Sequence, residues 1–271
     1  MIRPSPAGFL LPARIFRVLL ILAALASGSA HALTVTVDAP QALKALLTQY
    51  LETAQAARMG ETLDETELER LRSVSADTAR ELLATEGYFS PQIETTLTRA
   101  DGDWVLRYAV TPGRRTLVRS VTIDFSGALA EAERADLRTN AEHGFTLKAG
   151  MPFRQAEWNA AKVAVLGPLL THRYPAAQLA TSEARVDPDT QSADLTLMVD
   201  SGPAFFYGEP VIIGSQRYPE SIVRNLSPIK PGQPYRSQDL LDYQAALETS
   251  GYYTQATVRI ETDPARAAAV P

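Results

Sequence analysis

The sequence has no cysteine and very little histidine. The absence of cysteine from all 271 residues excludes a disulfide scaffold, thiol catalysis and cysteine-based zinc sites. Apart from His31, the only histidines are His143 and His172, and their spacing indicates neither a metal site nor a catalytic triad. Glycine-rich phosphate loops, nucleophile elbows and His-Glu-x-x-His motifs are also missing. We therefore expect no enzymatic activity, no cofactor and no metal.

Residues 1–32 have the pattern of a secretory signal peptide. Arg3, Arg14 and Arg17 form a positive start, residues 18–26 form a short apolar run, and Ala30-His31-Ala32 ends it as a small-x-small cleavage site. The run is shorter than the roughly 20 residues of a spanning helix, so an uncleaved anchor is the less favoured alternative. Cleavage after Ala32 would place the mature chain in an exported compartment.

The mature chain is acidic and has no long apolar run. Loss of three arginines with the leader changes the formal net charge from −5 to −8. No cluster of Lys and Arg is present that would bind phosphates, which argues against nucleic acid as a partner. No segment after Ala32 is apolar for 18 residues, so no membrane-spanning helix is expected there.

The chain repeats itself with a period of about 80 residues. Gly150-Met151-Pro152-Phe153-Arg154 recurs 82 residues later as Gly232-Gln233-Pro234-Tyr235-Arg236. Gly87-Tyr88-Phe89 recurs as Gly251-Tyr252-Tyr253, and Arg173-Tyr174-Pro175 holds the equivalent place between them. A fixed period indicates an array of one small unit. We predict three domains, at residues 33–113, 114–202 and 203–271.

The first repeat predicts a two-layer α+β sandwich. Residues 33–37 alternate as a strand, and a helical stripe of leucines follows up to Leu51. A second helix ends at Gly87. Residues 93–97 and 104–110 alternate around a turn at Ala100-Asp101-Gly102, as in a hairpin. The order β-α-α-β-β predicts two helices on a three-stranded mixed sheet.

The second repeat keeps this order, with one expected irregularity. Strands are predicted near residues 118–125, 178–186 and 193–199, with helices near residues 130–137 and from residue 155. Gly167-Pro168 lies inside the second of these helices and is expected to kink or split it.

The third repeat is predicted to lack its last strand. Strands are predicted at residues 206–213 and 256–262, and helices near residues 221–226 and 237–250. Only 20 residues follow Gly251, against 26 between Gly87 and the closing Gly113 of the first repeat. The sequence therefore predicts a truncated third domain with an unpaired edge.

Taken together, these motifs resemble POTRA domains, the periplasmic modules of the Omp85 superfamily of outer-membrane proteins. The stretch from Leu82 through Gly87-Tyr88-Phe89 to Val110-Thr111-Pro112-Gly113 resembles the first POTRA domain of the TamA family. The stretch from Phe206-Tyr207-Gly208 through Leu247-Glu248-Thr249-Ser250-Gly251-Tyr252 resembles the third. The second repeat is the weakest match, because Arg173-Tyr174-Pro175 replaces Gly-Tyr-Phe.

The resemblance implies a periplasmic scaffold for outer-membrane protein assembly, including autotransporter secretion. It implies a TamB-like partner anchored in the inner membrane, unfolded outer-membrane protein segments as further partners, and a role in lipid movement between membranes. In the family a membrane barrel follows the third domain. The alternatives are another Omp85 member, such as the main barrel-assembly protein, or an exported enzyme that uses His143 and His172.

Edge-strand pairing is the expected binding mode, because an exposed sheet edge can add an extended partner segment through backbone hydrogen bonds. In the alternative, these edges face water and are blunted by the charges of Glu94, Arg99, Glu183 and Arg185. The candidate partner-binding residues lie on the second strand of each repeat: Gln92, Ile93, Thr95, Leu97, Leu179, Thr181, Val258 and Ile260.

Overall fold

The computed structural model describes residues 32–131 and 135–263, which divide into two compact units. The described part of unit 1 runs to Arg80 and includes Ile93–Thr111; unit 2 comprises Glu81–Gln92 and the chain from Pro112 onward. The predicted signal peptide lies, apart from Ala32, outside the described residues. Within the described ranges no helix is long and apolar enough to cross a membrane.

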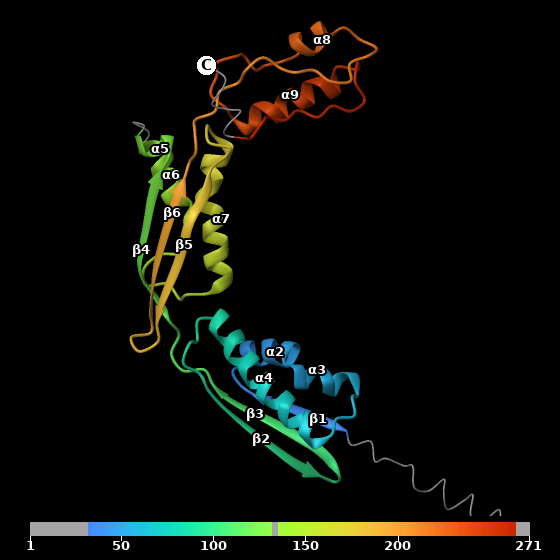
Figure 1. Cartoon of the computed structure of the whole chain (residues 1–271), viewed down its shortest axis with the longest axis vertical. Coiled ribbons are helices and arrows are strands. Elements are labelled where there is room, and N and C mark those ends of the chain that lie inside the picture. The colour runs from blue at the N-terminus through green and yellow to red at the C-terminus, as the bar shows by residue number, and fades with distance from the viewer. Residues whose placement is uncertain (1–31, 132–134, 264–271) are drawn as a thin grey trace, which may run out of the picture. The chain divides into compact units, whose positions relative to one another are not determined.

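The first repeat has the predicted order with one additional helix. Its central strand is the last in sequence, because the sheet order is β1-β3-β2 and β1 runs parallel to β3. The helices lie on one face of this sheet (Figure 1). The elements are β1 (Leu33–Asp38), α2 (Gln41–Tyr50), α3 (Glu52–Met59), α4 (Glu65–Thr85), β2 (Gln92–Ala100) and β3 (Asp103–Thr111).

The additional helix α3 arises where the leucine stripe ends. Leu51 adopts extended dihedral angles, φ −62° and ψ 132°, and so separates α2 from α3. Helix α3 ends at Gly60, which has a left-handed conformation. Its buried residues are Thr53, Ala54 and Ala56, which are small or polar. A search for large apolar side chains at helical spacing therefore misses this helix.

A buried polar network connects α3, α4 and β3. Thr53 donates its backbone N–H to Ser75 Oγ at 3.0 Å, and its hydroxyl is 2.9 Å from the Tyr108 hydroxyl. Ser75 and Thr78 donate to the two carboxylate oxygens of Glu52. Burial opposes ionisation of Glu52, but these hydrogen bonds outweigh it and lower its pKa. The network satisfies polar groups that would otherwise destabilise the core.

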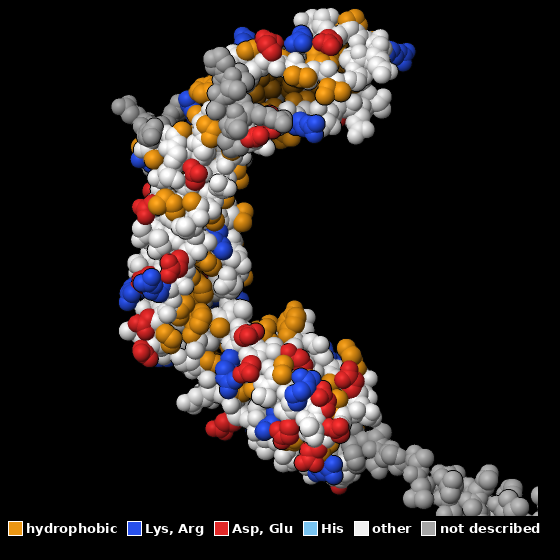
Figure 2. All heavy atoms as spheres, viewed as in Figure 1, with side chains coloured by type: hydrophobic (Ala, Val, Ile, Leu, Met, Phe, Trp, Pro, Cys, Tyr) orange, Lys and Arg blue, Asp and Glu red, His pale blue; other side chains and the backbone are white. Residues whose placement is uncertain are grey.

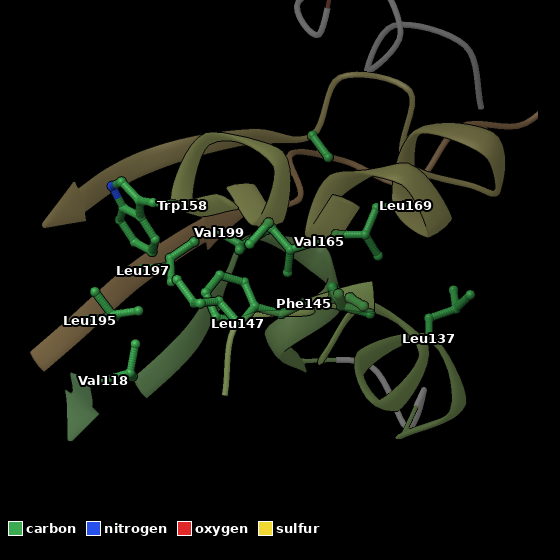
Figure 3. Close-up of a cluster of buried hydrophobic side chains, with 14 of the residues drawn as sticks. Val118, Leu137, Phe145, Leu147, Trp158, Val165, Leu169, Leu195, Leu197 and Val199 are labelled. Atoms are coloured by element: carbon green, nitrogen blue, oxygen red, sulfur yellow. The ribbon is translucent and has the colours of Figure 1, made fainter. Parts of the chain in front are cut away.

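The second repeat also follows the predicted order, with two helices, α5 and α6, where one was predicted near residues 130–137. Its sheet order is β4-β6-β5, with β4 parallel and β5 antiparallel to the central β6. Side chains of α6 and α7 meet those of β6 in a single hydrophobic core (Figure 3). The elements are β4 (Leu117–Ser126), α5 (Ala128–Glu131), α6 (Ala135–Gly144), α7 (Gln155–Thr171), β5 (Gln178–Asp187) and β6 (Ser192–Asp200).

Helix α7 continues through Pro168, so the alternative of a split helix is wrong. Proline at this position cannot donate to the carbonyl of Ala164, one turn earlier. Gly144 lies against that carbonyl, and a Cβ on Gly144 would be 2.7 Å from its oxygen. The helix remains continuous because it is buried along Trp158, Val165 and Leu169. Tertiary packing thus outweighs the loss of one helical hydrogen bond.

The third repeat forms its helices but no sheet in the residues described. Helices α8 (Glu220–Asn225) and α9 (Ser237–Thr249) lie close to their predicted positions. Residues 206–213 and 256–262 were predicted as strands, and this prediction is wrong: they form loops, apart from a single bridge between Phe206 and Pro234. In the other two repeats the outer strands pair only with the third strand. Residues 203–263 contain no such strand, so neither segment has a ladder partner.

The repeated Gly-x-Pro turns adopt the same geometry in both places. In the first, Thr116 donates its N–H to the carbonyl of Gly87 at 2.8 Å, and Phe153 donates to the carbonyl of Thr116 at 2.9 Å. Leu117 and Pro152 form a bridge beside them. The turn ahead of α7 is therefore joined to the start of β4 and to the loop that follows α4.

The second copy of this motif uses Arg173 where the first uses Gly87. Phe205 donates to the carbonyl of Arg173 at 2.8 Å, and Tyr235 donates to the carbonyl of Phe205 at 3.0 Å. Arg173 has φ +67°, a conformation that favours glycine. Its guanidinium lies 4.9 Å from the ring centre of Phe206, which holds the side chain in place. The predicted equivalence of Arg173-Tyr174-Pro175 with Gly-Tyr-Phe therefore has a backbone basis.

Candidate partner-binding edges

Strand β2 occupies an outer position of its sheet, beside β3. Ile93, Thr95 and Leu97 are half-buried, whereas Gln92 is exposed. The three half-buried residues alternate with exposed ones, so they share the face that is covered by helices. The backbone of β2 therefore forms an edge of the sheet, while every second side chain supports the core.

The turn after β2 determines which backbone groups of β2 point outward. Asp101 and Gly102 form a two-residue turn with φ values of +53° and +92°. In such a hairpin the residues flanking the turn exchange hydrogen bonds, and bonded pairs then alternate along the ladder. Counting back from Ala100, the residues that bond to β3 include Thr96. Thr95, between these bonded positions, directs its N–H and C=O away from β3, as do Ile93 and Leu97.

Charged side chains hold the edge of β2 in place without covering it. Arg72 on α4 donates to Thr95 Oγ1 at 3.2 Å and pairs with Glu69 at 2.6 Å. Arg99 lies 4.2 Å from the ring centre of Trp104 on the neighbouring strand. These contacts involve the side chains only, so the outward backbone groups of β2 remain the feature that an extended segment could bind.

Strand β5 is also an edge strand, but its backbone is irregular. A register shift separates Leu179 from Thr181 opposite β6. Leu179 pairs with buried Val199, whereas Thr181 pairs with half-buried Met198, so the two candidates lie on opposite faces of the sheet. Residues two apart share a face in a regular strand, but the β-bulge between Leu179 and Thr181 removes this relation, and a bulge leaves no reliable signal in a single sequence.

Both edges have exposed charged residues, Glu94 and Arg99 on β2 and Glu183 and Arg185 on β5, but only β5 combines them with a register shift. Glu183 and Arg185 are exposed neighbours on β5 and pair at 3.3 Å. Bulges and charged side chains are the devices by which natural sheets discourage edge-to-edge pairing. The β5 edge therefore has the features of a blunted edge.

The two candidates in the third repeat do not lie on a strand. Val258 and Ile260 are half-buried and alternate with exposed residues, which is the predicted pattern. Val258 packs against buried residues of α8 and α9, whereas Ile260 packs against the cluster of Phe205, Tyr207 and Tyr235. Backbone N–H groups of Ala256 and Val258 are bound by side chains of α9, namely Glu248 and Gln244. The segment is thus held in place by the helices and not by a sheet.

Strands β1 and β4 are also edges of these three-stranded sheets, which the sequence reasoning did not consider. Strand β4 has a register shift between Val118 and Ser120, and Arg119 at the shift pairs with Asp194 on β6. Hydrogen bonds from Arg119 and then Ser120 lower the pKa of Asp194 to about 2. The ion pair joins β4 to the central strand beside its bulge.

The histidines of the mature chain do not form a site. His143 lies in the last turn of α6 and His172 follows α7, and both are exposed. Across the described ranges, no group of three or more His, Asp or Glu side chains is arranged to hold a metal ion.

Two family models match the chain in its first and third repeats. The model described as POTRA domain TamA domain 1 matches residues 34–112. The POTRA model described as surface antigen variable number repeat matches residues 206–269. Together they cover just over half of the chain.

Several solved structures are similar to this chain at low sequence identity. POTRA domains 3–5 of Haemophilus influenzae BamA are 18% identical, with 85% of this chain and 89% of that chain covered and a TM-score of 0.44. The N-terminal domain of Omp85 from Thermosynechococcus elongatus is 18% identical, with 87% and 91% covered and a TM-score of 0.34. BamA from Haemophilus ducreyi lacking POTRA domains 1–3 is 19% identical, and the match spans 62% of this chain but only 28% of that one, with a TM-score of 0.33.

The β-α-α-β-β order and the matched models define a tandem array of POTRA domains. The matched models identify a POTRA region of the TamA/Omp85 type. POTRA domains of Omp85 proteins are periplasmic modules associated with the outer membrane. They bind protein partners and substrates in outer-membrane protein assembly and secretion, and they are not enzymes.

Proposed function

We propose that this chain is a periplasmic docking scaffold that binds a TamB-like, inner-membrane-anchored partner by edge-strand pairing. Residues 1–32 act as the signal peptide, and residues 33–113, 114–202 and 203–271 form three POTRA domains. The match of the first repeat to a TamA-type domain supports this choice of partner. Unfolded segments of outer-membrane proteins, including autotransporters, are the proposed clients.

The outward backbone groups of β2 are the observation that carries this proposal. A regular edge can accept several consecutive hydrogen bonds from an extended segment, and these bonds supply affinity with little dependence on sequence. The edge of β5 offers a shorter regular stretch because of the shift after Leu179. We therefore assign the docking role to Ile93, Thr95 and Leu97, and a lesser role to Thr181.

A second candidate function is that of the POTRA region of a barrel-assembly protein, which would bind other periplasmic subunits. The family models include a general POTRA match in the third repeat, which is compatible with this alternative. The two functions differ in the partner that the first repeat binds. A chain that fails to bind a TamB-like segment while it binds barrel-assembly subunits would favour the alternative.

Substitution of Thr95 tests the proposal directly. Thr95→Pro removes an outward N–H and blocks pairing at this edge, whereas Thr95→Val keeps the N–H and removes only the hydroxyl that Arg72 contacts. In a pulldown with the C-terminal region of the TamB-like partner, we expect at least tenfold weaker binding for Thr95→Pro and near-normal binding for Thr95→Val. Equal binding by the two variants would rule out the β2 edge.

A further inference from the structure

Residues 86–89 end helix α4 and are at the same time bound to the second repeat. Gly87 donates its N–H to the carbonyl of Ala84, and Tyr88 donates to the carbonyl of Leu83, both at 2.9 Å. With Gly87 at φ +89°, these two bonds form the Schellman ending of a helix. Movement of this segment away from α4 would therefore unwind the last turn of the helix.

An ion pair and a ring contact bind the same segment to the second repeat. Arg154, directly before α7, donates to both carboxylate oxygens of Glu86, at 2.9 and 3.0 Å. Phe89 packs against the hydrophobic core of the second repeat, and its ring centre lies 6.0 Å from that of Phe153. The segment thus adds both a charged and an apolar contact to the backbone bond between Thr116 and Gly87.

The pair of Glu86 and Arg154 is partly shielded from water. Its side chains are 23% and 39% exposed. Figure 2 shows charged side chains of both signs interspersed over the part of the chain that holds α2, α3 and α4. There, Asp77 and Arg80 form an ion pair on α4 whose side chains are 71% and 52% exposed. Exposed pairs contribute little to stability, whereas a shielded pair with two parallel hydrogen bonds contributes more.

The second copy of the motif forms without such a pair. When the Gly-x-Pro turns are aligned, Arg236 corresponds to Arg154 and His172 corresponds to Glu86. The backbones of His172 and Arg236 form a bridge, but the Arg236 side chain pairs with Asp239 of its own helix at 4.0 Å. The turn and its backbone bonds therefore need no ion pair across them. The pair of the first copy is an additional link between the end of α4 and the second repeat.

We propose that residues 86–89 are a clamp through which the stability of the second repeat depends on the first. Helix α4 is continuous, and it crosses from unit 1, which contains it up to Arg80, into unit 2, which includes Glu81–Gln92. Loss of order in unit 1 would unwind α4 and withdraw Glu86 and Phe89 from the second repeat. In an array of repeats, such nearest-neighbour contacts decide how far the units unfold together. This coupling does not depend on which partner the chain binds.

Unfolding of unit 1 by substitution, with the readout in unit 2, tests this dependence in the full chain. Leu47 on α2 is fully buried, so Leu47→Asp places a charge in the core and should unfold unit 1. Trp158 on α7 reports the second repeat in a Trp104→Phe background. We expect Leu47→Asp to lower the urea midpoint of the Trp158 signal by about 0.5 M or more. An unchanged midpoint in a chain whose unit 1 exchanges its amides as an unfolded segment would overturn the proposal.

A double-mutant cycle separates the clamp from a purely local contact. Arg154→Gln should lower the Trp158 midpoint when unit 1 is folded. It should have less than about half of that effect in the Leu47→Asp background, because the clamp is then already withdrawn. Arg236→Gln makes the same change in the second copy and should have the same effect in both backgrounds. Equal effects of Arg154→Gln in the two backgrounds would assign residues 86–89 to unit 2 alone and would overturn the proposal.

Discussion

Gly87 and Gly150 adopt similar backbone conformations but differ in their surroundings. Both have positive φ, at +89° and +84°. A Cβ on Gly87 would be 2.2 Å from the carbonyl oxygen of Phe153, whereas a Cβ on Gly150 would meet nothing within 4 Å. Gly150 therefore requires only conformational freedom, while Gly87 also permits a close approach of two backbones.

Alanine substitutions should separate these two effects. We expect Gly150→Ala to lower the unfolding free energy of unit 2 by about 1 kcal/mol through backbone strain. Gly87→Ala should cost at least about 3 kcal/mol, because strain and a backbone clash add. Trp158 fluorescence in a Trp104→Phe background would report unit 2 alone, since these are the two tryptophans of the chain. Equal losses for the two variants would contradict this account.

The ionisation of Asp194 makes the stability of the second repeat depend on pH. Its pKa is about 2 in the folded chain, below its usual value of 3.8, chiefly because of the hydrogen bond from Arg119. A lowered carboxyl pKa stabilises the fold above the unfolded value, and this stabilisation disappears as the pH falls through the folded value. We expect the stability difference between wild type and Asp194→Asn to shrink between about pH 4 and about pH 2. A difference that stays constant over this range would contradict the role of the ion pair.

At the scale of elements, β2 has two kinds of backbone position. Thr96 bonds to β3 in the register set by the Asp101-Gly102 turn, whereas Thr95 points outward. Thr96→Pro should therefore lower the unfolding free energy of unit 1 by roughly 1–3 kcal/mol, because it removes a ladder bond and leaves a carbonyl of β3 without its donor. Thr95→Pro should cost much less.

Denaturation followed by Trp104 fluorescence, in a Trp158→Phe background, would measure both variants. Trp104 lies on β3 and is 7% exposed, so it reports the sheet of unit 1. If Thr95→Pro proved more destabilising than Thr96→Pro, the register would be shifted by one residue. The outward N–H and C=O groups of β2 would then be those of Thr96 and the residues that alternate with it.

Strands with alternating apolar and polar residues could be predicted from sequence where a neighbouring strand is present. The presence of that neighbour could not be predicted. Residues 178–186 and 193–199 were predicted within one residue at each end of β5 and β6, because buried strands require alternate apolar residues. Residues 256–262 have the same alternation but form no strand, since a strand exists only through hydrogen bonds to a neighbour. Local pattern contains no information on whether that neighbour is present.

The positions of the candidate partner-binding residues could also be predicted only in part. The sequence placed Ile93, Thr95 and Leu97 on one face of an edge strand, and the sheet order agrees. Leu179 and Thr181 were predicted on the second strand of their repeat, which is β5, but the register shift between them puts them on opposite faces of the sheet. The additional edges at β1 and β4 were overlooked because sheet order is a tertiary property that a single strand does not encode.

At the scale of the whole molecule, the chain is an array of three similar repeats, and the described residues of the third form no sheet. The other two repeats have a central strand that pairs on both sides. Arrays of this kind suit proteins that hold partners, because each repeat with a complete sheet offers its own edges. The central claim is that an extended partner binds at the edge of β2.

Hydrogen exchange of the full chain in complex with the C-terminal region of the TamB-like partner tests this claim most directly. The N–H groups of Ile93, Thr95 and Leu97 point away from β3, so they should exchange rapidly in the free chain and slowly in the complex. Thr96 should change little, because its N–H already bonds to β3. A complex that forms without slower exchange at any of the three outward positions would contradict docking by strand pairing at β2.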